Sequence, residues 1–249
     1  MARTNPKAVK RHGGVQPFYL VLGAVALAGV AAIAYAAVGR NGGDMAAEPV
    51  DMTALTNPRD IYAMAEPVVI GPTDAPNKLV VFSDFMCPGC QAWAQRIEPL
   101  LKERYADPGV LQIAYYDFPL GGSHVHSFLA ARAARCAQDQ GRFWEYHDLL
   151  FARQRDWSFV RAPASDFVDY AADLGLDRNS FETCLRSDRH AELVTASRVL
   201  GDQLGVNSTP TVLINGKRVG DPFDWEAYPP LLQAGPADTA ALETAPSAQ

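Results

Sequence analysis

Residues 79–90 read LVVFSDFMCPGC. The apolar first half is typical of a buried strand, and a helix-like run extends from Gly89 to about Tyr105. The two cysteines therefore stand where a strand gives way to a helix. A helix N-terminus carries a partial positive charge and free backbone N–H groups, so it favours a thiolate over a thiol. Because the thiolate is the reactive form of cysteine, this stretch predicts a reactive dithiol or disulfide at the start of a helix.

Cys87 and Cys90 are three residues apart, which places both sulfurs on one side of a helical turn. Pro88 suits the first helical position, where the N–H that it lacks would have no partner. Cys90 shares a helical face with the apolar Trp93 and Ile97, so it is expected to point into the core. Cys87 is expected to be exposed. A substrate thiolate would attack the sulfur of Cys87, and a second substrate thiol would resolve the mixed disulfide; in the reverse direction Cys90 is the resolving cysteine.

Two other roles for this pair stay open, a fixed structural disulfide and half of a zinc site. Structural zinc usually takes four nitrogen or sulfur ligands, and no second CxxC motif follows in the chain. His124, His126 and His147 are each expected to have a charged-face or capping role rather than to bind a metal. The sequence therefore predicts neither a metal nor a cofactor.

The composition excludes one class of function. The chain has 249 residues, a formal net charge of −6 and 48% hydrophobic residues. One or two domains with an ample core are expected, and a nucleic-acid-binding surface is not indicated. The charge is uneven along the chain, because Arg3, Lys7, Lys10 and Arg11 all precede the first acidic residue, Asp44.

Residues 17–39 contain no charged side chain and are long enough to cross a bilayer as a helix. Because residues 1–16 are basic, the positive-inside tendency places the N-terminus in the cytoplasm and the later residues outside. We therefore predict a single-pass transmembrane anchor at 17–39, followed by a linker at 40–65. The alternative is a cleaved signal peptide, since Ala34-Tyr35-Ala36 resembles a small-x-small cleavage site. Both alternatives export the same domain to the periplasm or the cell surface.

The predicted secondary structure changes along the remaining residues. Strands and a helix come first, a run of helices follows, and a hairpin with its turn at Asn215-Gly216 precedes a final helix. The predicted fold class is α/β, with one domain formed by 66–122 and 205–233, an all-helical domain inserted at 123–204, and a disordered tail at 234–249. The predicted strands cover 68–70, 78–85, 110–118, 211–214 and 217–219. The predicted helices cover 89–105, 127–137, 143–153, 165–174, 179–186, 190–204 and 224–232, with N-caps at Ser165 and Asn179.

A second motif, Thr209-Pro210, directly precedes a predicted strand. A proline in this position can take the cis form in a tight turn, and the isomer stays open at this point. A cis bond would present the backbone of Thr209 beside Cys87, where it can pair with the backbone of a substrate.

Three segments together resemble the thioredoxin superfamily and, within it, the DsbA-like thiol–disulfide oxidoreductases. The resemblance covers residues 67–232. It implies a thioredoxin fold with an inserted helical domain, a cis-proline loop, and thiol–disulfide exchange outside the cytoplasm. It also implies that Cys87 is the nucleophile, Cys90 the resolving cysteine, and Thr209-Pro210 the substrate-binding loop. The segments are FSDFMCPGC at 82–90, FWEYHDLLF at 143–151 and GVNSTPTVLING at 205–216.

The chain departs from the DsbA-like pattern in two places. The dipeptide between the cysteines is Pro88-Gly89, whereas a histidine there helps to stabilise the thiolate in many DsbA-like proteins. Val81 stands six positions before Cys87, where the family often has an acid that relays protons to the buried cysteine. Asp84 is nearer, but strand alternation puts it on the opposite face from Val81, so the relay role is not transferred to it.

Cys136 and Cys184 form the other pair. Each shares a helical face with apolar residues, so both are expected to point into the helical domain. In an oxidising compartment two facing buried thiols are usually joined, which favours a structural Cys136–Cys184 disulfide. Buried free thiols and a redox relay to the first pair are the alternatives.

These expectations combine into an extracytoplasmic oxidoreductase that introduces disulfides into exported proteins. The expected partners are reduced or misfolded exported proteins and, by the family resemblance, a quinone-linked membrane protein that reoxidises the dithiol. A disulfide reductase or isomerase and a non-catalytic thioredoxin-fold chaperone are the alternatives.

Overall fold

The computed structural model describes residues 49–53 and 57–233. The predicted basic segment 1–16, the anchor 17–39 and the tail 234–249 lie outside the described residues. Within the described ranges, no helix has both the length and the apolar character that crossing a membrane requires.

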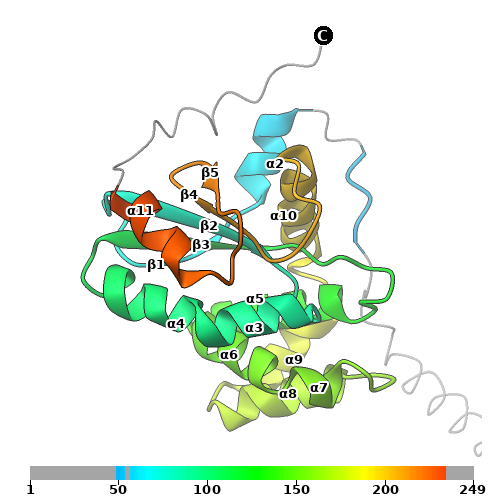
Figure 1. The fold of residues 1–249 in the computed structure, drawn as a ribbon. Helices are drawn as coiled ribbons and strands as arrows, with labels where there is room; N and C mark the ends of the chain where they lie inside the picture. The colour runs from blue at the N-terminus through cyan, green and yellow to red at the C-terminus, as the bar shows by residue number, and fades with distance from the viewer. Residues whose placement is uncertain (1–48, 54–56, 234–249) are drawn as a thin grey trace, which may run out of the picture. The chain divides into compact units, whose positions relative to one another are not determined.

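The centre of the structure is a five-stranded sheet in the order β1-β3-β2-β4-β5 (Figure 1). Strands β2 and β3 run parallel, and the other three pairings are antiparallel. Both faces of β2 are covered, because Leu79 and Val81 pack on one side and Phe82 on the other. The predicted apolar run therefore forms a central strand. The strands are β1 Val68–Ile70, β2 Asn77–Ser83, β3 Leu111–Asp117, β4 Thr211–Ile214 and β5 Lys217–Arg218.

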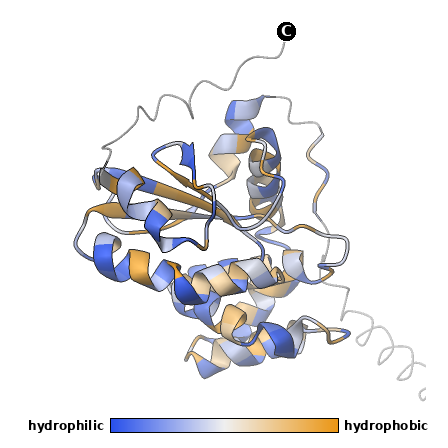
Figure 2. Ribbon diagram, in the orientation of Figure 1, coloured by the Kyte–Doolittle hydropathy of each residue, from blue (hydrophilic) through white to orange (hydrophobic). Residues whose placement is uncertain are grey.

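The turn between β4 and β5 follows the predicted hairpin. Asn215 and Gly216 both have positive φ, 50° and 76°, which a two-residue hairpin turn requires. The Asn215 side chain also fastens the turn to β2, since its Oδ1 accepts from the Lys78 backbone N–H at 2.9 Å. Figure 2 shows hydrophobic residues along the central strands and hydrophilic ones on β5.

The helix that begins at the cysteine motif is broken, where one continuous helix to residue 105 was predicted. It consists of α3 Pro88–Arg96, α4 Glu98–Leu101 and the π-helical turn η1 Lys102–Ala106. Ile97 ends α3 and precedes α4, and Pro99 stands in the first turn of α4. Proline has no N–H to donate and its ring crowds the preceding turn, which explains the break.

Helices α2 Pro58–Met64 and α10 Ala191–Gln203 lie together on one side of the sheet (Figure 1). Ile61, Phe82 and Leu200 belong to the cluster that fills this side. The linker predicted at 40–65 is therefore wrong for α2, and α10 packs on the sheet although it was assigned to the inserted domain. Apolar spacing identifies the buried face of a helix but not the surface that covers it.

The other side of the sheet is covered by α3, α4 and α11, and a block of helices packs beneath α3 (Figure 1). Two predicted N-caps in this block are wrong. Pro163 precedes α8 without a side-chain cap, and Asp177 caps α9 by accepting from the Ser180 N–H. The short α7 was not predicted. The remaining helices are α5 Ser127–Gln138, α6 Phe143–Ala152, α7 Gln154–Trp157, α8 Ala164–Asp173, α9 Arg178–Arg186, α11 Tyr228–Gln233 and the 3-10 turn η2 Trp225–Ala227.

Candidate active site

The cysteine motif lies where the sequence predicts it, at the junction of β2 and α3. Cys87 is the N-cap of α3, with extended backbone angles of −71° and 121°, and Pro88 opens the helix. A tight turn leads into it, because the Cys87 N–H donates to the carbonyl oxygen of Asp84 at 3.0 Å. The free N–H groups of the first helical turn are therefore directed toward the Cys87 side chain.

The two thiols differ in exposure, but not as the sequence suggests. Cys90 is completely buried, as predicted, whereas Cys87 keeps only 8% of its exposed area and is not the exposed residue that was expected. The loop at Thr209 covers it. The Cys87 thiol donates to the carbonyl oxygen of Thr209 at 3.4 Å, a contact between residues 122 positions apart that no local pattern encodes.

The surroundings of the two sulfurs shift their pKa values in opposite directions. A hydrogen bond from the Cys90 thiol is the main reason that the pKa of Cys87 falls to about 6; burial opposes it, and donors from Thr209 and the Cys90 and Gly89 backbone add to it. Burial raises the pKa of Cys90 well above its ordinary value, and the neighbouring Cys87 raises it further. At neutral pH the reduced pair is therefore a Cys87 thiolate beside a Cys90 thiol.

The peptide bond between Thr209 and Pro210 is cis. The Thr209 hydroxyl has no hydrogen-bond partner within the described part of the chain by strict geometry, yet it lies close enough to Cys87 to help lower its pKa. A pocket of about 230 Å³ lies beside this loop. Its lining includes Thr209, Pro210, Val212, Arg218, Val219 and Phe223.

Gly89 faces the same loop. A Cβ atom at this position would lie 3.4 Å from Cδ of Pro210 and 3.5 Å from both Sγ of Cys87 and the Thr209 oxygen. These are ordinary van der Waals distances, so the Cβ atom of a larger residue at position 89 would be in direct contact with the sulfur and with the Thr209-Pro210 loop. Glycine here adds no side chain to the cover over Cys87, and it supplies no charge to the thiolate.

Asp84 is the residue that sequence reasoning undervalued. Its side chain is buried, and its backbone N–H donates to Sγ of Cys90 at 3.4 Å. Its carboxylate accepts from the N–H groups of Met86 at 2.6 Å and Leu120 at 2.8 Å. The signal in the sequence was an acid three residues before the motif. Strand alternation argued against a role for Asp84, but alternation does not apply to it because β2 ends at Ser83.

Two further contacts were not predicted, and one of them joins distant segments. Gln154, on the unpredicted α7, donates from Nε2 to the carbonyl oxygens of Phe85 and Cys87 at 2.7 and 3.0 Å. The helical block is thereby tied to the active-site turn. The Ser83 hydroxyl is the other contact, and it favours the thiolate of Cys90.

The three histidines have different surroundings. His124 is bonded to Asp84 through Nδ1 at 2.9 Å, and His126 is bonded to the Val160 carbonyl oxygen through Nε2 at 2.7 Å. His147 is fully buried among aromatic rings, with Nε2 3.8 Å from a carboxylate oxygen of Glu98. The charged-face role expected for His147 is therefore wrong.

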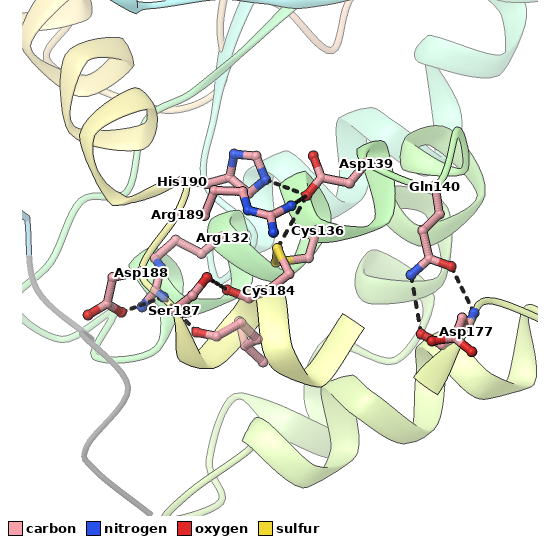
Figure 3. The surroundings of a disulfide bond; sticks show 11 residues. Arg132, Cys136, Asp139, Gln140, Asp177, Cys184, Ser187, Asp188, Arg189 and His190 are labelled. Atoms are coloured by element: carbon pink, nitrogen blue, oxygen red, sulfur yellow. Dashed lines mark hydrogen bonds and ion pairs between the residues drawn. A yellow bond between two sulfur atoms is a disulfide. The ribbon is translucent and has the colours of Figure 1, made fainter. Parts of the chain in front are cut away.

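The second cysteine pair is a disulfide between α5 and α9 (Figure 3). Cys136 and Cys184 are 1% and 3% exposed. A carboxylate oxygen of Asp139 lies 3.4 Å from Sγ of Cys184, a close contact and not a hydrogen bond because a disulfide sulfur carries no proton. The same oxygen accepts from Arg189 and His190. In the described residues the two sulfurs and His190 form a cluster of metal-ligand type, but the disulfide occupies both sulfurs.

A thioredoxin-like sheet that carries one thiolate and one buried thiol at a helix start defines the class of thiol–disulfide oxidoreductases. The family model described as thioredoxin matches residues 64–234. The chain belongs to the thioredoxin family, and the predicted resemblance to its DsbA-like branch is confirmed. The predicted thioredoxin-like α/β fold is confirmed as well.

Two solved structures illustrate the shared fold. Oxidised BdbD from Bacillus subtilis has a TM-score of 0.60 and 23% identity, covering 72% of this chain and 97% of that one. MdbA, a thiol-disulfide oxidoreductase from Corynebacterium diphtheriae, has a TM-score of 0.55 and 21% identity, covering 65% and 87%. Among curated proteins, the probable disulfide bond formation protein D of Bacillus anthracis is 29% identical over 169 residues, covering 66% of this chain and 77% of that protein.

Other curated relatives are larger proteins named as Na(+)/H(+) antiporters. The Na(+)/H(+) antiporter NhaA 3 of Salinispora tropica is 36% identical over 159 residues, which is 64% of this chain. The chain spans about a quarter of the length of the antiporters that it matches, between 23% and 29%. The similarity therefore concerns one part of these proteins.

Proposed function

We propose that this protein is an extracytoplasmic oxidoreductase that introduces disulfides into exported proteins through Cys87 and Cys90. The observation that carries the proposal is the division of the pair, with the pKa of Cys87 lowered to about 6 and that of Cys90 raised. A stabilised Cys87 thiolate stabilises the reduced form of the protein. The disulfide form is correspondingly more oxidising, because it gains this stabilisation when it accepts two electrons.

The reaction begins from the Cys87–Cys90 disulfide. A substrate thiolate attacks Sγ of Cys87, the bond to Cys90 breaks, and Cys90 takes up a proton in the buried site. A second substrate thiolate then attacks the substrate sulfur of the mixed disulfide, and Cys87 leaves as a thiolate. Its low pKa makes it a good leaving group. The substrate becomes a disulfide, and its two electrons remain on the dithiol.

Substrate binding is assigned to the loop beside the sulfur. The Thr209 carbonyl oxygen lies 3.4 Å from Sγ of Cys87, so a chain joined to Cys87 must pass along Thr209-Pro210. The pocket beyond the loop, with Phe223 and Arg218, offers apolar and polar contacts to an unfolded substrate. Reduced or misfolded exported chains fit a shallow site of this kind.

The proposal also covers where the protein is located and how its Cys87–Cys90 dithiol is reoxidised. The uncharged residues 17–39 behind a basic segment support a membrane anchor, with the catalytic domain outside the cytoplasm. A quinone-linked membrane protein would then remove the two electrons from the reduced pair. Protease digestion of intact cells or spheroplasts that carry the full chain tests the topology. Degradation of the domain supports external exposure, and protection until the membrane is lysed contradicts it.

A reductase or isomerase is the nearest alternative, since Gly89 and Val81 replace two groups that favour strong oxidation in DsbA-like proteins. A chaperone that holds chains without redox chemistry is the other. Refolding of a reduced, unfolded substrate by the wild type and by Cys87→Ser separates the three. Oxidative refolding by the wild type alone supports the oxidase; reduction of substrate disulfides without oxidation supports the reductase. Equal assistance by both proteins supports the chaperone.

A further inference from the structure

We propose that His124, held in place by Asp84, supplies the positive charge that the Cys87-Pro88-Gly89-Cys90 motif itself lacks. The inference rests on the proposed function and deepens it, because a cation held at the active-site turn through Asp84, near enough to interact electrostatically with Cys87, favours the oxidising direction. His124 lies 37 positions after Cys87 in the sequence, so the motif alone gives no indication of it.

The loop that carries His124 is fastened to the active-site turn. The Asp84 carboxylate accepts from the Leu120 N–H and from Nδ1 of His124 at 2.8 and 2.9 Å, and Sδ of Met86 accepts from the His126 N–H at 3.2 Å. Asp84 is also the residue whose carbonyl oxygen accepts from the Cys87 N–H. The histidine and the reactive cysteine are therefore attached to the same buried residue.

The contact with Asp84 decides the protonation of the ring. A carboxylate only accepts hydrogen bonds, so Nδ1 of His124 carries its proton and Nε2 is the site that gains the second one. The hydrogen bond to Asp84 is the main cause that raises the pKa of His124; partial burial opposes it, and the charges of Asp84 and Cys87 add to it. Asp84 and Cys87 are the charged groups that act on this ring.

Electrostatic attraction acts equally on both partners. If the Cys87 thiolate favours the imidazolium of His124, the imidazolium favours the thiolate to the same extent. The disulfide form has no thiolate to stabilise. A charged His124 therefore lowers the free energy of the reduced pair alone, which raises its reduction potential. This contribution is present while His124 is protonated and is lost as the pH rises through the pKa of His124.

The test is a set of variants in the full chain, with the Cys87 pKa measured by pH-dependent alkylation and the potential by equilibration with glutathione. In His124→Ala we expect the Cys87 pKa to rise by about half a unit to one unit. The dithiol–disulfide equilibrium should shift about three- to tenfold toward the disulfide. Asp84→Asn should move both quantities in the same direction. His126→Gln is the matched control on the same loop, and it should leave both unchanged.

His124→Lys distinguishes charge from structure. A lysine carries its positive charge without needing the Asp84 hydrogen bond, so this variant should retain the low Cys87 pKa and the wild-type dithiol–disulfide equilibrium at the same pH. Wild-type values for both quantities in His124→Ala, with a native circular dichroism spectrum, would overturn the inference. If the shifts occur but the wild type does not oxidise substrates, the inference stands and the proposed direction of the reaction fails.

Discussion

The two cysteine pairs of this chain differ chiefly in where helices place them. Cys87 caps the start of α3, whereas Cys136 and Cys184 lie in the last turns of α5 and α9. A helix start stabilises a thiolate, and a helix end, with its partial negative charge, disfavours one. The nearby Asp139 carboxylate adds to this effect at the second pair. Burial is similar in both regions, so the surroundings of the sulfur decide which pair is reactive.

The chain separation differs as well. Cys87 and Cys90 close a single helical turn, while the second disulfide spans 48 residues and joins two helices of the helical block. A bond that closes a long loop restricts the unfolded chain far more than one that closes a short loop. The first pair is therefore suited to opening and closing during exchange, and the second to holding the helices together.

The comparison between the two pairs is tested most directly by replacing Cys87 in one variant and both cysteines of the second pair in another. Cys87→Ser should lower disulfide exchange by about two orders of magnitude or more, because no other thiolate can form the mixed disulfide. The double variant Cys136→Ser/Cys184→Ser should retain exchange per folded molecule. Initial rates with a reduced peptide measure both. Loss of activity in the folded double variant would show that the second pair takes part in the reaction.

Stability should show the reverse pattern. Losing the 48-residue crosslink in Cys136→Ser/Cys184→Ser is expected to lower the free energy of unfolding by about 2–4 kcal/mol. Cys87→Ser should change the stability of the oxidised protein by much less, because its loop is short. Urea unfolding of each variant, followed by circular dichroism, gives the values. A cost below about 0.5 kcal/mol for the double variant would contradict a structural role.

The dependence on pH separates the two cysteines of the reactive pair. Alkylation of Cys87 should rise with a midpoint near pH 6, and Cys90 should stay unreactive to well above pH 9. Folding lowers the Cys87 pKa from 9.0 to about 6, so this thiolate stabilises the reduced protein fully above pH 9 and not below pH 6. Mass spectrometry after pulsed alkylation assigns each site. Equal reactivity of both thiols would contradict the division of the pair.

The smallest expected effect concerns Asp139. Asn in its place leaves Arg189 and His190 near the disulfide without the carboxylate. A thiolate formed there is then less disfavoured, and reduction of Cys136–Cys184 should be roughly two- to fivefold faster. Dithiothreitol reduction in a Cys87→Ser/Cys90→Ser background follows this bond alone. Asp169→Asn, which removes a surface partner of Arg178, is the matched control. An unchanged or slower rate would show that the carboxylate does not protect the bond.

Local sequence patterns were enough to predict much of the fold and the position of the reactive cysteines. The strand that leads to Cys87, the burial of Cys90 and the turn at Asn215 each depend on a few adjacent residues, and the structure has all three. The Cys136–Cys184 bond followed from two apolar helix faces in one compartment, and the structure contains it.

Contacts between distant segments could not be predicted from local sequence patterns. The cover over Cys87 comes from Thr209, and the partner of Asp84 comes from a loop 40 positions away. Neither contact leaves a periodic signal, because each depends on how the sheet brings loops together at its edge. The same limit explains α2, whose few apolar residues indicate a partner only once α10 is seen against the sheet.

The reduction potential of the Cys87–Cys90 pair tests the central claim most directly. Equilibration with glutathione buffers, followed by alkylation and mass spectrometry, measures it while the Cys136–Cys184 disulfide stays closed. A pair with a stabilised Cys87 thiolate should have a potential of about −180 mV or higher, in the range of proteins that oxidise substrates. A value near about −270 mV, which is that of a reducing thioredoxin, would contradict the assignment of this pair as the source of disulfides.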